Sequence, residues 1–149
     1  MNNRYICKAK RKDNGEWVYG YYVFQRKRSG VFGQVISELD CDRHLIIDLR
    51  GNSYEVISET VGQCTGLKDK NGKLIFEGDI MISPIGRKGI VSFGTYKPWS
   101  TSDSDDFESW KLSVVGMNNT ECGLGKSCTE FMKVIGNIHD NPELLEAHK

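Results

Sequence analysis

The chain has 149 residues, of which 38% are apolar and 27% charged, and its formal net charge is zero. This length suffices for one domain, or for two small subdomains sharing a core, but not for two independent enzymatic lobes. The composition argues against disorder, and the balanced charge gives no overall attraction to nucleic acid or to an anionic membrane.

Short strands dominate the first half of the chain. Residues 5–24 contain two runs rich in aromatic and β-branched residues, separated by Asp13-Asn14-Gly15. Because Asn-Gly is typical of a type I′ turn, this stretch predicts a β-hairpin. Further strands are expected at residues 31–36, 45–49 and 53–58, with a turn at residues 50–52 that joins the last two into a second hairpin.

The second half continues the same pattern. Strands are expected at residues 80–82, 89–93, 110–115 and 131–135, with polar loops at residues 95–109 and 116–127. Asn141 followed by Pro142 and Glu143 predicts a short C-terminal helix, because these residues suit an N-cap and a first helical turn. Many short strands with glycine turns indicate a mainly β fold of short-stranded antiparallel sheets, in the form of a small barrel or roll.

Targeting and redox features favour the cytoplasm. No apolar run approaches the roughly 18 residues that span a bilayer, and residues 1–12 lack a hydrophobic signal core. The five cysteines are odd in number and without framework spacing, which predicts free thiols in a reducing compartment. Zinc bound by Cys41, His44, Cys122 and Cys128 is the alternative, but neither pair has Cys-x-x-Cys spacing, and the sequence does not say whether the four come close. We expect no metal and no cofactor.

The stretch TGLKDKNGKLIFEGDI, residues 65–80, resembles an ion-binding loop at first sight. If Asp69 and Asn71 took the third and fifth positions of an EF-hand loop, Leu67 and Gly78 would stand where carboxylates are needed, so a calcium site is not expected. A structural role fits better. Asp69 would accept hydrogen bonds from amides of its own turn, and the pair Asn71-Gly72 would form a type I′ reversal. Leu74 and Phe76 would face the core and alternate with Lys73, Ile75 and Glu77 on the outer face of the strand. Gly66, Gly78 and Asp79 would shape the bends on either side.

Two other patterns in the sequence support neither phosphate binding nor catalysis. The segment CGLGKS at residues 122–127 resembles the end of a P-loop, but its first glycine position holds Thr120, and a strand rather than a helix is expected after it. His44, His139 and His148 have no neighbouring nucleophile, and the acids at residues 103–108 are typical of a solvated loop. No catalytic residue is expected.

The N-terminal hairpin is both basic and aromatic, which leaves two interpretations open. A basic ribbon with aromatic faces can follow a phosphate backbone and stack bases, as single-stranded nucleic-acid binders do. Otherwise the aromatic rings fill the core and the cations protect an exposed edge. The residues that would contact nucleic acid are Lys8, Lys10, Arg11, Lys12, Trp17, Arg26, Lys27 and Arg28, interleaved with Tyr5, Tyr19, Tyr21 and Tyr22.

The motifs EWVYG, ETVGQ, TGLKDKNGK, EGDI and VIGNI followed by NPELL occur in this order across nearly the whole chain. In this combination the chain resembles the YopX family of bacteriophage and prophage proteins. The resemblance implies a single unit with a β-rich N-terminal region at residues 1–63 and an SH3-like barrel region at residues 64–149, whose loops at 95–127 vary. It implies no established activity and no catalytic residues.

Taken together, these features predict a non-enzymatic accessory protein of a bacteriophage that binds an unknown macromolecule in the host cytoplasm. Single-stranded nucleic acid is the alternative partner. Exposed strand edges pair readily, so self-association is a further expectation that light scattering would measure.

Overall fold

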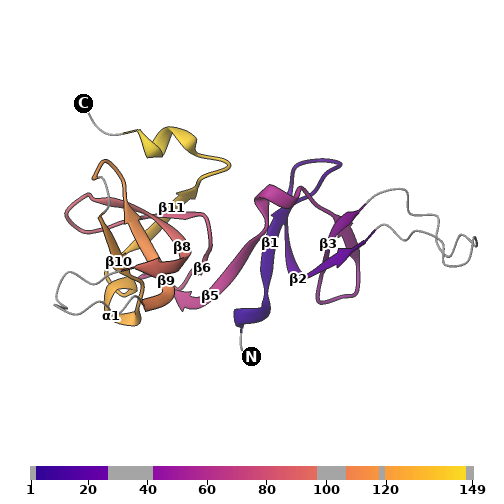
Figure 1. Ribbon diagram of the computed structural model, residues 1–149, viewed down its shortest axis with the longest axis horizontal. Helices are drawn as coiled ribbons and strands as arrows, with labels where there is room; N and C mark the ends of the chain where they lie inside the picture. Colours follow the sequence, from indigo (N-terminus) through magenta and orange to yellow (C-terminus); the bar gives the residue numbers. More distant parts are fainter. Residues whose placement is uncertain (1–2, 27–41, 97–106, 118–119, 147–149) are drawn as a thin grey trace, which may run out of the picture. The chain divides into compact units, whose positions relative to one another are not determined.

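The computed structural model describes residues 3–26, 42–96, 107–117 and 120–146. The described chain is mainly β with antiparallel pairing, as predicted. It divides into two compact units (Figure 1), the first formed by Tyr5–Gln63 and the second by Met1–Arg4 with Cys64–Lys149. Among the described residues, no helix is long and apolar enough to cross a bilayer.

The first unit is a twisted antiparallel sheet with a small core. A 3₁₀ helix, η1 (Asn3–Tyr5), precedes the strands in the chain, and only its Tyr5 belongs to this unit. The strands are ordered β4-β3-β2-β1 in the sheet. Ala9, Ile46 and Val56 form the buried core of this unit. The elements are β1 (Cys7–Lys10), β2 (Trp17–Gln25), β3 (Arg43–Ile47), β4 (Ser53–Glu55) and the 3₁₀ helix η2 (Ser58–Thr60).

Both hairpins predicted in this unit are present, but the first turn is not type I′. The amide of Arg11 donates to the carbonyl of Glu16 at 2.9 Å, so that four residues form the loop. The Asn14 side chain accepts from the Glu16 amide at 2.9 Å and stabilises this wider loop, which a two-residue turn would not allow. The strand expected at residues 31–36 lies outside the described residues.

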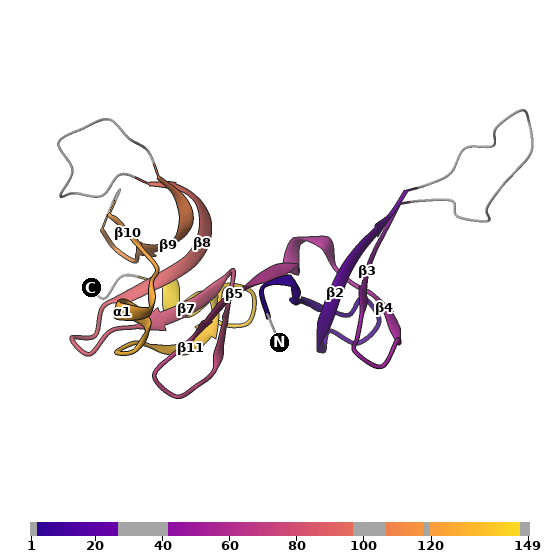
Figure 2. The same cartoon turned by 90° about the horizontal axis from the view of Figure 1, so that it is seen from below.

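The second unit contains a five-stranded sheet with the order β10-β9-β8-β7-β11. Strand β5 begins in the first unit, where Gly62 and Gln63 pair with β1, and the rest of the strand pairs with β6. Figure 2 shows β8 and β9 as long curved neighbours. The elements are β5 (Gly62–Lys68), β6 (Leu74–Phe76), β7 (Asp79–Ile82), β8 (Lys88–Tyr96), β9 (Phe107–Val114), β10 (Glu121–Gly123), α1 (Lys126–Thr129), β11 (Lys133–Asn137) and the 3₁₀ helix η3 (Pro142–Leu145).

Apolar side chains from β6, from the five-stranded sheet and from the segments next to α1 form one core in this unit. Ile75 from β6, Met81 from β7 and Val91 from β8 are 0–1% exposed, and Leu112, Leu124, Met132 and Val134 complete the cluster. The prediction that Leu74 and Phe76 alternate with an outward Ile75 is therefore wrong for Ile75. It is buried beside the also buried Phe76, because a short strand enclosed between other elements is buried on both faces.

The structure differs from three predictions for the second unit. The predicted C-terminal helix is the single 3₁₀ turn η3, whereas the segment expected to be a loop at residues 116–127 contains β10 and the start of α1. The expectation of a strand after Ser127 is also wrong, because α1 continues to Thr129, whose side chain is buried. Described strands β10 and β11 end the sheet without pairing with each other, so the SH3-like barrel stays a prediction.

Candidate functional site

The residues 65–80 motif folds into a hairpin centred on Asp69. Its Oδ1 accepts hydrogen bonds from the amides of Asn71 and Lys73, each at 2.9 Å, as predicted. The Asp69 amide donates to the Lys73 carbonyl and its carbonyl accepts from Gly72, so the loop has three residues and the predicted type I′ turn is wrong. Gly72 nevertheless has the expected positive φ, of 80°.

Asp69 also connects this hairpin to a distant strand. Its Oδ2 accepts a hydrogen bond of 3.0 Å from the amide of Val134 in β11, and the carboxylate is 6% exposed. Burial alone would raise the pKa of Asp69, but the hydrogen bonds from Val134, Lys73 and Asn71 outweigh it and lower the pKa below 3.8. The carboxylate is therefore ionised and structural, with its oxygens turned to backbone amides.

The remaining motif residues shape the bends around β6. Gly78 has a φ of 86° between β6 and β7, and the Asp79 carboxylate accepts from the Phe76 amide at 2.8 Å, as expected for a residue that caps this bend. Asp79 is 1% exposed. Gly66 has a φ of 80° within β5. The motif thus organises the backbone of the second unit.

Basic and aromatic side chains share one face of the two strands β1 and β2. Lys8 lies opposite Tyr19 and Lys10 opposite Trp17 in the pairing of β1 with β2. Directly opposite residues share a face, and Tyr21 continues this face two positions after Tyr19. We call Lys8, Lys10, Trp17, Tyr19 and Tyr21 the aromatic–lysine face.

The two lysines of this face are held close to the indole. The Nζ atoms of Lys8 and Lys10 lie 4.8 Å and 5.5 Å from the centroid of the Trp17 ring. Lys8 is 8% exposed, whereas Tyr19 and Tyr21 are 52% and 48% exposed. The face therefore combines positive charge at one end with open aromatic rings along β2.

The opposite face of β2 carries a second aromatic group. The Tyr22 hydroxyl and His44 Nδ1 are 2.6 Å apart, and their rings stack with centroids 6.0 Å apart. Phe24 lies directly opposite His44 in the pairing of β2 with β3, and their ring centroids are 5.0 Å apart. His44 is thus engaged with aromatic neighbours.

The four residues considered for zinc have different surroundings. Cys41 lies outside the described residues, and His44 belongs to the aromatic group of the first unit. Cys122 and Cys128 line one pocket of the second unit. Within the described ranges, no group of three or more His, Cys, Asp or Glu side chains could hold a metal ion.

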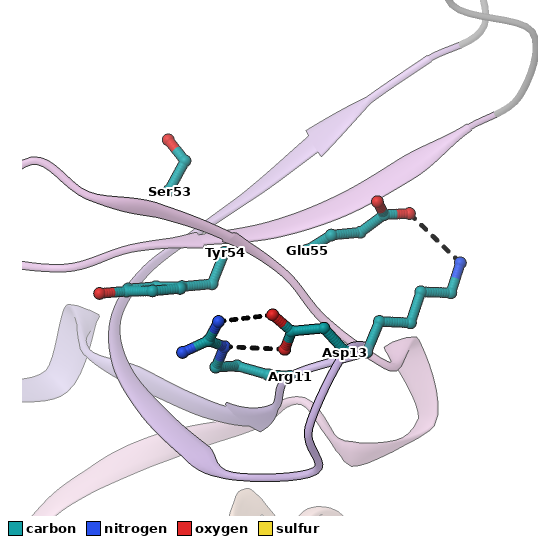
Figure 3. Close-up of a pocket in the computed structure, with 6 residues that line it drawn as sticks. Arg11, Asp13, Ser53, Tyr54 and Glu55 are labelled. Carbon is teal, nitrogen blue, oxygen red and sulfur yellow. Dashed lines mark hydrogen bonds and ion pairs between the residues drawn. The ribbon is translucent and has the colours of Figure 1, made fainter.

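A polar pocket of about 380 Å³ lies beside the first hairpin loop. Figure 3 shows the Arg11 guanidinium joined to the Asp13 carboxylate by two hydrogen bonds, Nε to Oδ1 at 2.9 Å and Nη2 to Oδ2 at 2.5 Å. These bonds raise the pKa of Arg11 and lower that of Asp13. Lys12 forms a 3.2 Å ion pair with Glu55, and this hydrogen bond lowers the pKa of the Glu55 carboxyl.

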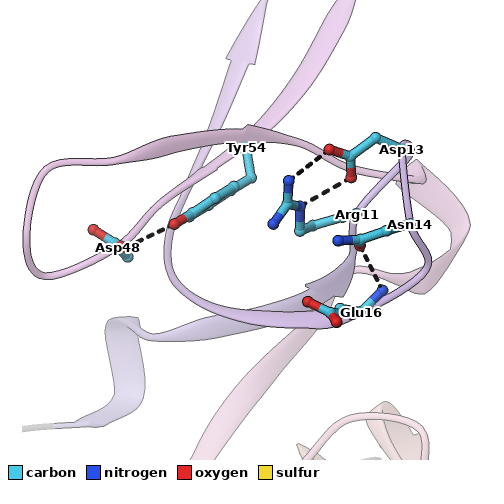
Figure 4. Close-up of polar contacts among 6 residues, drawn as sticks. All are labelled: Arg11, Asp13, Asn14, Glu16, Asp48 and Tyr54. Carbon is cyan, nitrogen blue, oxygen red and sulfur yellow. Dashed lines mark hydrogen bonds and ion pairs between the residues drawn. The ribbon is translucent and has the colours of Figure 1, made fainter.

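The ring of Tyr54 closes one side of this pocket. Figure 4 shows it between Arg11, whose guanidinium lies 4.7 Å from the ring centroid, and Asp48, which accepts its hydroxyl hydrogen bond at 3.3 Å. Each charged group in the pocket therefore already has a protein partner. The pocket fixes the loop and presents little unbalanced charge to a ligand.

These contacts divide the eight residues predicted to contact nucleic acid. Lys8, Lys10 and Trp17 lie together on the aromatic–lysine face, whereas Arg11 and Lys12 are paired with acids around the loop pocket. Arg26 is exposed at the end of β2, and Lys27 and Arg28 lie outside the described residues. The residues predicted to contact nucleic acid did not include Tyr19 and Tyr21. Their alternation with Trp17 in the sequence was the signal that they share its face of the strand.

The comparisons agree with the motifs. The family model of the YopX protein matches residues 8–146, nearly the whole chain. No curated protein matches the chain. On the extent of the family match, this chain belongs to the YopX protein family.

Proposed function

We propose that this protein is a non-enzymatic accessory protein of a bacteriophage, which binds another macromolecule in the host cytoplasm through the aromatic–lysine face. The proposal that it is not an enzyme rests on the sequence, in which no acid, base and nucleophile stand in a recognisable arrangement. We also propose that the second unit forms an SH3-like barrel and that the protein self-associates.

The exposed aromatic residues of β2 carry the proposal. Tyr19 and Tyr21, on the aromatic–lysine face, are 52% and 48% exposed, and Tyr22 and Phe24, on the opposite face of the strand, are 39% and 43% exposed. The interpretation in which these rings fill the core is therefore wrong for them, since the first core is built from Ala9, Ile46 and Val56. Aromatic side chains bury a large area at little entropic cost, and for this reason they are enriched at interfaces.

Removal of two of these rings tests the proposed surface. Tyr19→Ala with Tyr21→Ala should abolish the capture of partners from infected host cells by the tagged protein, without changing its thermal unfolding. Phe131→Ala is the matched control, because Phe131 is 62% exposed on the second unit. Equal capture by the wild type and the double variant would overturn the proposal.

Single-stranded nucleic acid is the second candidate partner, and the position of the two lysines favours it. Their ammonium groups lie over Trp17, next to the open ring of Tyr19. Bases that stack on Tyr19 and Tyr21 would place phosphates within reach of this positive charge. Arg11 and Lys12 contribute less to this candidate than the sequence predicted, because Asp13 and Glu55 balance their charges.

Binding measured at a series of salt concentrations tests whether single-stranded nucleic acid is the partner. Binding to short oligonucleotides should weaken steeply with salt, because phosphate contacts release counterions. Lys10→Glu with Trp17→Ala should abolish binding, whereas Lys70→Glu, on an exposed hairpin of the second unit, should leave it nearly unchanged. Binding that depends neither on the salt concentration nor on Lys10 would exclude nucleic acid as the partner of this face.

A further inference from the structure

The second unit contains a pocket of about 440 Å³ that reaches its apolar core. Leu112 and Met132, which are 2% and 8% exposed, belong to that core and also line the pocket. Val114 extends the same apolar wall along β9. The volume lies in the range of small-molecule sites, roughly 300–1,000 Å³.

Two cysteines give part of the pocket wall a polarizable, uncharged surface. Cys128 Sγ lies 3.3 Å from Met132 Sδ, and Cys122 lines the pocket from β10. Burial, and secondly the neighbouring Cys122, raises the pKa of the Cys128 thiol above 9.0. Because the thiol is then protonated at pH 7, this wall adds no negative charge.

The rim of the pocket is positively charged. Arg87 and Lys88 line it from the hairpin that joins β7 to β8, and the described lining residues include no acid. Neither cation forms an ion pair with another described residue. An anionic group at the rim would therefore gain two partners without displacing a carboxylate.

The hairpin holds these two cations on fixed backbone. The Ser83 amide donates to the Arg87 carbonyl at 2.9 Å, and the Arg87 amide donates to Ser83 Oγ at 3.1 Å. Lys88 then pairs with Ile82 in the ladder between β7 and β8. The backbone that carries the two cations is thus fixed before any ligand arrives, which reduces the entropic cost of binding.

Because the interior of the pocket is apolar and its rim is cationic, we propose that it binds a small organic anion with an apolar body, such as a medium-chain carboxylate. The apolar body fills the space over Leu112, Met132 and Cys128, and the carboxylate contacts Arg87 and Lys88. This site lies wholly within the second unit and does not depend on the function proposed for the aromatic–lysine face.

The rate at which the cysteines react with a thiol reagent measures binding in this pocket. Decanoate below its micelle concentration should slow the labelling of Cys122 and Cys128 by N-ethylmaleimide, as resolved by peptide mass spectrometry. Cys7 belongs to the first unit and serves as the reference, whereas Cys64 is fully buried and stays unlabelled while the second unit is folded. Absence of protection, or equal slowing at Cys7, would overturn the proposal.

The rim charges are tested separately. Arg87→Gln with Lys88→Gln should weaken protection by decanoate about tenfold, because a charge-assisted hydrogen bond is lost. Protection by the uncharged decanol should not change. Lys70→Gln with Lys133→Gln removes the same charge from exposed positions outside the pocket and should have no effect. Equal weakening by both double variants would show that the rim does not recognise the anion.

Discussion

Asp69 shows how far a single residue can be understood from the sequence. Its hydrogen bonds to the amides of Asn71 and Lys73 follow from local chain geometry, and the sequence predicts them. The third bond, from Val134, could not be predicted, since the two residues are 65 positions apart and only the folded sheet brings them together. One carboxylate thus stabilises both a turn and a long-range contact.

Replacement of Asp69 by Asn should destabilise the second unit by about 2–4 kcal/mol, because an amide nitrogen cannot accept and leaves buried amides unsatisfied. Thermal unfolding at pH 7 measures this loss. Asp48→Asn is the control, since Asp48 accepts the same two local bonds, from the amides of Arg50 and Asn52, at a half-buried position. An equal loss in the two variants would contradict the role given to burial and to Val134.

The same carboxylate predicts a pH dependence. The folded state lowers the pKa of Asp69 below its ordinary value of 3.8, so the unfolded chain takes up this proton first as the pH falls. The stabilisation is complete above about pH 4 and is lost below it, as the pH falls through the folded pKa. Acid unfolding followed by circular dichroism should therefore be less steep in Asp69→Asn than in the wild type. Identical profiles would refute the assignment.

Glycine is required at position 20 because a side chain there would have no room. A Cβ at this position would overlap the carbonyl oxygen of Ile47 and lie 2.7 Å from the carbonyl carbon. Gly20→Ala should therefore destabilise the first unit by about 1–3 kcal/mol in chemical denaturation. In Gly15→Asn the added side chain meets open space, and Asn tolerates the φ of 73°, so the loss should be under about 1 kcal/mol. The reverse order would show that Ile47 does not approach Gly20 closely.

At the scale of elements, one hairpin design occurs three times in the described part of the chain. In the segments 48–52, 69–73 and 83–87, the first amide donates to the last carbonyl, and the first side chain accepts from the last amide. The fourth residue is a glycine with a φ between 80° and 87°. A polar residue followed three positions later by Gly was thus a readable signal for a three-residue loop, although Asn-Gly alone suggested a two-residue turn.

Gly72→Val tests this design. Valine is forced into a positive φ at a position with open space around it, so the second unit should lose about 1–3 kcal/mol in thermal unfolding. Gly72→Asn should recover most of this stability, because Asn adopts the left-handed region more readily. A Val variant as stable as the Asn variant would refute the backbone argument.

Strand faces and helix ends were harder to predict than strand positions. The pattern of β2 indicates a strand, but it does not tell which aromatic rings are covered, since burial depends on what packs above the sheet. For the same reason Ile75 was expected outside and lies in the core. Helix α1 has only four residues, too few to give a helical period in the sequence.

At the scale of the whole molecule, family membership and the mainly β fold were both evident from the sequence and are confirmed. The candidate surfaces were only partly evident. Basic residues pointed to the first hairpin, but the ion pair of Lys12 with Glu55 and the pocket of the second unit arise from contacts between residues far apart in the sequence. The two candidate surfaces belong to different units, so variants can address each one alone.

The central claim is that the aromatic–lysine face contacts the partner, and site-specific photo-crosslinking in infected host cells tests it most directly. A photoreactive phenylalanine analogue in place of Tyr19 should give a discrete adduct, whereas the same analogue in place of Phe131 on the second unit should give none. Digestion of the adduct by nuclease or by protease then identifies the class of the partner. An adduct at Phe131 and none at Tyr19, or equal adducts at both, would contradict the account.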